Sequence, residues 1–97
     1  MGVSNTSDFG AAVLFARKAV GLTQEDFDEV SSRVYVSALE RKIKKPTLPK
    51  VDALAGRMGL HPLTVLALAY CVHPGDQGEV EELLAMVQQQ LLALTER

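Results

Sequence analysis

Apolar residues recur along this chain at intervals of three and four positions, which is the spacing of one face of an α-helix. Capping residues, glycines and prolines divide the pattern into helical segments joined by short turns. No alternation of apolar and polar residues predicts a strand, and the apolar residues are mostly Ala, Leu and Val. The predicted fold class is therefore all-α. The six predicted helices cover about residues 8–20, 23–30, 32–42, 48–58, 62–72 and 79–95.

Local signals place the ends of these helices. Ser7 is the predicted N-cap of the first helix, and Thr23 with Asp26 three residues later approximates a capping box at the second. Gly59 follows the fourth helix, where a glycine can adopt the left-handed conformation that ends a helix. Pro62 opens the fifth, at a position that tolerates a residue without an N–H group.

The predicted helix 32–42 carries an apolar ladder on one side and small or basic residues on the other. We expect Val36, Leu39 and Ile43 to face the core. The predicted outward residues are Val34, Ser37, Ala38 and Arg41, with Arg33 at the N-terminal corner. A narrow helix face edged with guanidinium groups suits the DNA major groove, which admits one helix.

Charge is distributed unevenly, although the net charge is only −2. Seven bases and two acids lie between residues 33 and 57. Residues 25–29 and 76–82 each contain four acids and no base. Ordinary solvated helix faces would explain such clusters, but bases sharing one surface would indicate a negatively charged partner.

Ninety-seven residues suffice for one hydrophobic core. No apolar run reaches the roughly 18–20 residues that span a bilayer, and the opening "MGVSNTSDFG" lacks the layout of a secretory signal. The single Cys71 cannot form an internal disulfide. We therefore expect a cytoplasmic protein without a membrane association.

Residues 9–69 resemble the phage-repressor/Cro-like (XRE-type) helix-turn-helix family. The resemblance rests on "FGAAVLFARKAVGLTQEDF", "SRVYVSALER", "KKPTLPKVDALAGRMGL" and "HPLTVLAL", which stand in the family's order and near its spacing. It implies a five-helix DNA-binding domain, here residues 1–72, whose third helix is the recognition helix. Residues 73–97 then form a loop and an additional amphipathic helix.

The resemblance also implies roles for individual residues. Gln24 would bind a backbone phosphate at the N-terminus of the second helix, where free N–H groups attract anions. Arg17 and Glu40 match a buried ion pair between the first and third helices. The residues expected at the DNA are Thr23, Gln24, Ser32, Arg33, Val34, Ser37, Ala38, Arg41, Lys42, Lys44 and Lys45.

Three features depart from the family pattern. The turn before the recognition helix is about two residues shorter and lacks its glycine, as "VSSR" shows. Lys42 stands where a glycine commonly ends the recognition helix. Ala38 replaces a long polar residue, so direct readout would rest on Arg33 bidentate to a guanine, with Val34 or Ala38 against a thymine methyl group.

Other chemistries find little support in the sequence. His61, His73 and Cys71 lack the spacing of a metal site. No phosphate-binding glycine loop or nucleophile motif is present. We expect neither an enzyme nor a bound cofactor or metal.

The helix 79–95 lies beyond the resemblance and leaves two interpretations open. Its apolar stripe consists of Val80, Leu83, Leu84, Val87, Leu91 and Leu94. The stripe could cover its own domain, against Leu14 and Phe15, or pair with the same helix of a second chain. We favour a homodimer, because helix-turn-helix proteins commonly read paired half-sites.

The predicted function is a sequence-specific transcriptional regulator, of bacterial or phage type, that binds double-stranded DNA as a homodimer. Two alternatives remain at this point. An antitoxin-type autoregulator would also bind a toxin protein, and a degenerate module would bind only protein. The sequence does not distinguish a repressor from an activator.

Overall fold

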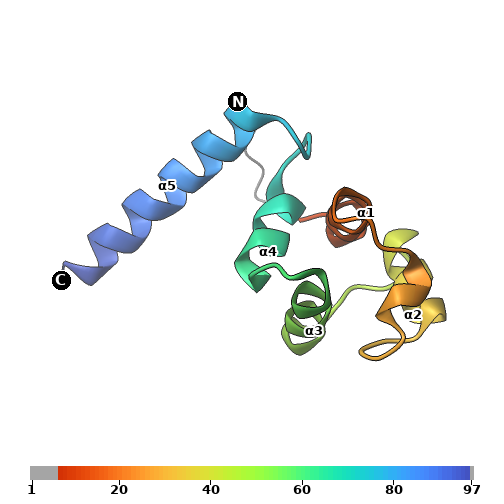
Figure 1. Ribbon diagram of the computed structural model, residues 1–97. Coiled ribbons are helices and arrows are strands. Elements are labelled where there is room, and N and C mark those ends of the chain that lie inside the picture. Colours follow the sequence, from red (N-terminus) through yellow and green to blue (C-terminus); the bar gives the residue numbers. More distant parts are fainter. Residues whose placement is uncertain (1–6, 97) are drawn as a thin grey trace.

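The computed structural model describes residues 7–96, and all its regular elements in that range are helical (Figure 1). Residues 1–6, most of the opening stretch considered for a leader, lie outside the described range, as does residue 97. The elements are α1 (Phe9–Ala19), η1 (Gln24–Phe27), α2 (Arg33–Glu40), α3 (Leu48–Met58), α4 (Pro62–Tyr70) and α5 (Gln77–Thr95). The predicted all-α fold is confirmed.

The second predicted helix is shorter than expected. Thr23 and Asp26 form the capping box, but the helix that follows is one 3₁₀ turn. The carbonyl oxygen of Phe27 accepts hydrogen bonds from the amides of both Val30 and Ser31. These bonds close a turn instead of extending the helix, so the chain reverses within residues 28–32 before α2 begins.

A single core joins η1 and the first four α-helices. α1 packs against α4 and α2, and α3 packs against α4. The fully buried large side chains are Val13, Phe27, Val36, Leu39, Val51, Leu54 and Val65. Burying such a side chain contributes about 1.5–3 kcal/mol, so these residues hold α2 firmly on the domain.

Side chains cap the N-termini of all five α-helices between residues 7 and 96. The carboxylate of Asp8, not Ser7, caps α1 by accepting from the amide of Ala11. Ser32 caps α2 by accepting from the amide of Tyr35, and Thr47 caps α3. Gly59 adopts the left-handed conformation after α3, as its position predicted. Each side-chain N-cap contributes about 1 kcal/mol to the stability of the fold.

The end of α2 differs from the prediction. The helix stops at Glu40, and Lys42 takes the left-handed conformation with φ 66°. The expectation that Ile43 faces the core is therefore wrong, because the left-handed turn redirects the chain and leaves Ile43 64% exposed. Lys42 thus adopts the left-handed conformation that glycine adopts most easily at the end of a helix. A side chain there costs roughly 1–2 kcal/mol.

α5 leaves the rest of the domain and points away from it (Figure 1). Its N-terminal part lies against α4, where Val80, Leu83 and Leu84 line a groove with α4 residues. Glu79, which is 4% exposed, anchors that end by accepting hydrogen bonds from the amides of Val72 and His73. Asp76 caps the same end by accepting from the amide of Glu79. The direction of α5 is thus set at its first turn.

Two expectations about α5 need correction. Leu83, assigned to the dimerisation stripe, is 7% exposed and lines a groove together with Leu63 and Leu68 of α4, so it belongs to its own domain. The stripe also does not cover Phe15. The aromatic ring of Phe15 instead lies in a surface groove with Leu14 and Pro74, because the loop after α4 crosses there.

Candidate nucleic-acid interface

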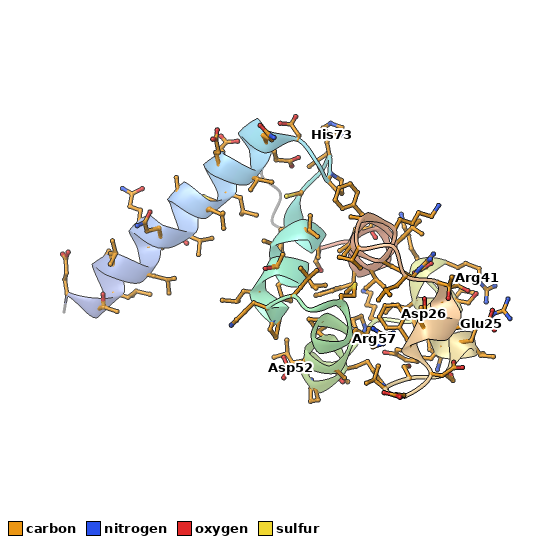
Figure 2. The ribbon with its side chains drawn as sticks, viewed as in Figure 1. Glu25, Asp26, Arg41, Asp52, Arg57 and His73 are labelled. Atoms are coloured by element: carbon orange, nitrogen blue, oxygen red, sulfur yellow. The ribbon has the colours of Figure 1, made fainter. Side chains whose placement is uncertain are left out.

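The exposed side of α2 lies at the end of the molecule opposite α5, where Figure 2 shows Arg41 projecting outward. Val34, the second residue of α2, is 77% exposed, and Arg33 before it is also exposed. The burial of Val36 and Leu39 on the other side of α2 forces this orientation. The outward face therefore begins with Arg33 and Val34 at the helix N-terminus.

Ala38 is not on that face. It is 6% exposed and belongs to the buried side of α2. Its assignment as a base-facing residue is wrong, because its side chain is buried together with those of Val36 and Leu39. The carbonyl oxygen of Ala38 accepts from the amides of Ile43 and Lys44. Ala38 thus holds the basic loop against the end of α2.

Ser37 and Arg41 form a pair one helical turn apart. The Nε group of Arg41 donates to Ser37 Oγ at 3.2 Å and to the carbonyl oxygen of Ser37 at 3.3 Å. Ser32, at the helix start, accepts from the amide of Tyr35 at 3.0 Å. These contacts hold Ser37 and Arg41 side by side on α2 and fix Ser32 at its N-terminus.

The ion pair implied by the resemblance is present and nearly buried. Arg17 donates from Nε to Glu40 Oε2 at 2.7 Å and from Nη2 to Glu40 Oε1 at 3.0 Å. The Nη1 group of Arg17 also donates to the carbonyl oxygen of Leu22. Gln24 adds a third hydrogen bond to Glu40, from Nε2 to Oε1 at 3.0 Å. Glu40 therefore ties α1 and η1 to the end of α2.

Burial by itself would raise the pKa of Glu40, but hydrogen bonds from Arg17 and Gln24 outweigh it and hold that pKa below its ordinary value. The side chain of Glu40 is only 5% exposed. An ionised carboxylate with three donors meets the requirement for a stable buried charge. The same network uses one amide N–H of Gln24, so a phosphate contact would need its other N–H.

The acidic residue Glu25 lies opposite Arg33, the first basic residue of α2. Glu25 Oε1 lies 3.7 Å from Arg33 Nη1, and both side chains are about two-thirds exposed. Figure 2 shows Glu25 at the same end of the molecule as Arg41. An exposed ion pair of this length is weak. Arg33 can therefore exchange Glu25 for another acceptor at little cost.

The basic loop after α2 carries three exposed lysines, of which Lys42 is paired with an acid. Lys42 Nζ lies 2.9 Å from Asp8 Oδ2 at the start of α1. The hydrogen bond from Lys42, followed by that from the amide of Ala11, lowers the pKa of Asp8. Lys44 and Lys45 are exposed beyond this anchor. The loop thus presents positive charge beside the N-terminus of α1.

Sequence reasoning did not predict three acidic residues that bind or anchor parts of this interface or of α5. Asp8, Glu25 and Glu79 each contact a residue from another part of the chain, and no spacing rule links them to Lys42, Arg33 or the loop amides. For Glu79 a signal existed, since Asp76 and Glu79 have capping-box spacing. Glu79 nonetheless turns away from its own helix to the loop before it.

No helix between residues 7 and 96 combines the length and the hydropathy needed to cross a bilayer. Over the same residues, no group of three or more His, Cys, Asp and Glu side chains is arranged to hold a metal ion. Burial, and then the nearby charge of Glu79, raises the pKa of the lone Cys71 thiol.

Comparisons with known proteins agree with this geometry. A family model described as Helix-turn-helix matches residues 15–65, which is more than half of the chain and runs from α1 into α4. Comparison with curated proteins and with solved structures finds no significant match. α5 lies beyond the matched residues. The chain belongs to the XRE-type, Cro/C1-like helix-turn-helix family of DNA-binding regulators.

Proposed function

We propose that this protein is a sequence-specific transcriptional regulator that inserts α2 into the major groove of double-stranded DNA as a homodimer. The observation that carries the proposal is the exposed N-terminal face of α2, with Arg33 and Val34 outermost. In helix-turn-helix proteins the N-terminal residues of the recognition helix contact base edges. A regulator of this kind would act in the cytoplasm.

Direct readout falls to the first two residues of α2. An arginine can donate two parallel hydrogen bonds to the O6 and N7 atoms of guanine, and a valine can contact a thymine methyl group. The ion pair between Glu25 and Arg33 is weak at 3.7 Å, so a DNA base can replace Glu25 as the partner of Arg33. The remaining outward residues, Ser37 and Arg41, extend the contact along the groove.

Backbone contacts flank this face on both sides. We assign Thr23, Gln24 and Ser32 to phosphates on the η1 side, and Lys42, Lys44 and Lys45 to phosphates on the loop side. Lys42 is already paired with Asp8, so Lys44 and Lys45 supply most of the positive charge that faces the phosphates on the loop side. Phosphate contacts orient the domain on the duplex without reading sequence.

Dimerisation falls to the distal part of α5. Leu84, Val87, Leu91 and Leu94 are all at least 38% exposed in the isolated chain. One helix-turn-helix unit makes few base contacts, and joining two units can tighten binding by about 10²–10⁴-fold. A second copy would cover this apolar surface and supply the second recognition helix.

Titration of duplex DNA at increasing salt tests the DNA-binding proposal. The logarithm of the affinity should fall linearly with the logarithm of the salt concentration. Changing Lys44 and Lys45 together to Ala should weaken binding to all sequences alike and reduce the slope by about two. Lys18→Ala is the matched control, because Lys18 lines the groove beside Phe15 and Pro74.

Binding that is independent of salt, or absent at low salt, would contradict the proposal. A slope change of about one for Lys18→Ala, half that of the double variant, would show that net charge, and not the basic loop, sets the affinity.

A further inference from the structure

The exposed apolar stripe of α5 has a symmetric spacing once Val80, which is half-buried and lines the groove beside α4, and the buried Leu83 are assigned to their own domain. Leu84, Val87, Leu91 and Leu94 remain exposed, at intervals of three, four and three residues. This order of intervals is the same in both directions along the helix. Two such stripes can therefore interdigitate when the helices run antiparallel, with Leu84 opposite Leu94 and Val87 opposite Leu91.

Charge selects between the two orientations that heptad-like spacing allows. Asp76, Glu79, Glu81 and Glu82 lie at one end of α5, whereas residues 83–95 contain no charged side chain. Parallel helices would bring two of these acidic clusters together without any base between residues 76 and 95. Antiparallel helices place the clusters at opposite ends, several Debye lengths of about 8 Å apart, and also align their dipoles favourably.

A groove between α4 and α5 supports the same orientation. Leu63 of α4, which is exposed, and Leu84 of α5 line this apolar groove of about 210 Å³. In an antiparallel pair the C-terminal part of the second α5 lies beside Leu84. Leu94 of the second copy would then lie at the groove and cover both leucines.

We propose that two copies of this chain pair through antiparallel α5 helices, centred on Gln89, with the C-terminal end of each helix at the α4–α5 groove of the other. The inference rests on the homodimer of the proposed function and specifies its geometry. The anchoring of α5 by Glu79 makes the geometry rigid, because the helix cannot swing freely about its first turn. The two DNA-binding domains are then held apart at opposite ends of the helix pair.

Spin labels at two polar positions distinguish the orientations in the full chain. Cys71 is changed to Ala, and a single cysteine is placed at Gln77 or at Gln89, which are exposed. Antiparallel pairing puts the two Gln77 positions about 36 Å apart along the helix axis, at 1.5 Å per residue. The two Gln89 positions lie at one level in either orientation, separated mainly by the about 8–10 Å between the helix axes.

The expected result is therefore a long intermolecular distance at Gln77 and a short one at Gln89. Short distances at both positions would overturn the proposal in favour of parallel helices. Sedimentation as a monomer, with no coupling at Gln89, would overturn both the orientation and the homodimer.

DNA binding is measured separately by gel shift on the same labelled chains. A chain that binds DNA but does not pair would refute this inference and leave the recognition role of α2 standing. A chain that pairs as expected but fails to bind DNA would refute the proposed function and leave the pairing geometry standing.

Discussion

The backbone of Gly10 in α1 lies directly against the carbonyl oxygen of Leu39 in α2, so that a Cβ atom on Gly10 would stand 2.6 Å from that oxygen. A second carbonyl oxygen, that of Glu40, would be 3.2 Å away. Only glycine permits this approach of the two helices. The contact fixes where the end of α2, and hence the face it presents to DNA, lies relative to the domain.

Gly10→Ala should therefore destabilise the domain by about 1–3 kcal/mol, as overpacking usually does. Alanine is roughly 1 kcal/mol more favourable than glycine inside a helix, so the steric cost of the added Cβ must exceed that gain for the variant to be less stable. Chemical denaturation followed by circular dichroism measures the difference in the free energy of unfolding.

Gly56→Ala is the matched control for Gly10→Ala. A Cβ at Gly56, within α3, meets nothing within 4 Å. We expect this variant to be more stable than the wild type by about 0.5–1 kcal/mol. Equal effects at the two glycines would show that the α1–α2 contact is not tight.

The Arg17–Glu40 pair makes stability depend on pH. Because the folded-state pKa of Glu40 lies below its ordinary value, the stabilisation is complete above the ordinary glutamate pKa of about 4.3. It is lost as the pH falls through the folded-state value. Glu40→Gln should lower the free energy of unfolding at neutral pH by about 3 kcal/mol, the lower end for breaking a buried pair.

The free energy of unfolding of Glu40→Gln should also vary less with pH between neutrality and the acid limb. Glu29→Gln, at an exposed turn position, serves as the control and should retain the wild-type pH profile. A Glu40→Gln profile parallel to that of the wild type would mean that other carboxylates cause the acid sensitivity.

Arg33→Ala should weaken binding to the cognate site by about 1–3 kcal/mol and relax the preference at one base pair. The reason is the place of Arg33 at the exposed N-terminus of α2. Selection from random duplexes, followed by sequencing, measures the change in preference. If wild type and variant select the same motif, Arg33 contacts only a phosphate.

Glu25→Gln should bind non-specific duplex DNA roughly two- to fivefold more tightly, the size expected for an exposed ion pair. The substitution releases Arg33 and removes a negative charge beside the predicted phosphate contacts. Fluorescence anisotropy at low salt measures the affinity. Glu81→Gln removes a charge from α5 instead and should leave the affinity unchanged.

Leu84 and Leu91 changed together to Glu should yield a monomer, since both side chains are more than half exposed in the single chain and belong to the proposed seam. Operator binding should weaken by about 10²-fold or more. Sedimentation and a gel shift on one palindromic site measure the two effects. Leu92→Glu, at an equally exposed position off the stripe, should remain dimeric.

The sequence by itself determined the helices and most of their ends. Caps and breakers such as Thr23, Thr47, Gly59 and Pro62 act on backbone groups within a few residues, so local spacing suffices to locate them. Apolar periodicity likewise predicted an all-α fold. The ion pair of Arg17 and Glu40, 23 residues apart, followed only from the family resemblance.

Only the tertiary structure decided which residues of a helix are accessible. Ala38 and Leu83 lie at positions that a helical wheel allows to face outward, but the packing of the folded chain buries both side chains. Ile43 was misplaced because α2 ends early, at a left-handed Lys42 that Asp8 holds. Such coverage depends on where distant segments pack, and the periodicity of a single helix carries no information about its neighbours.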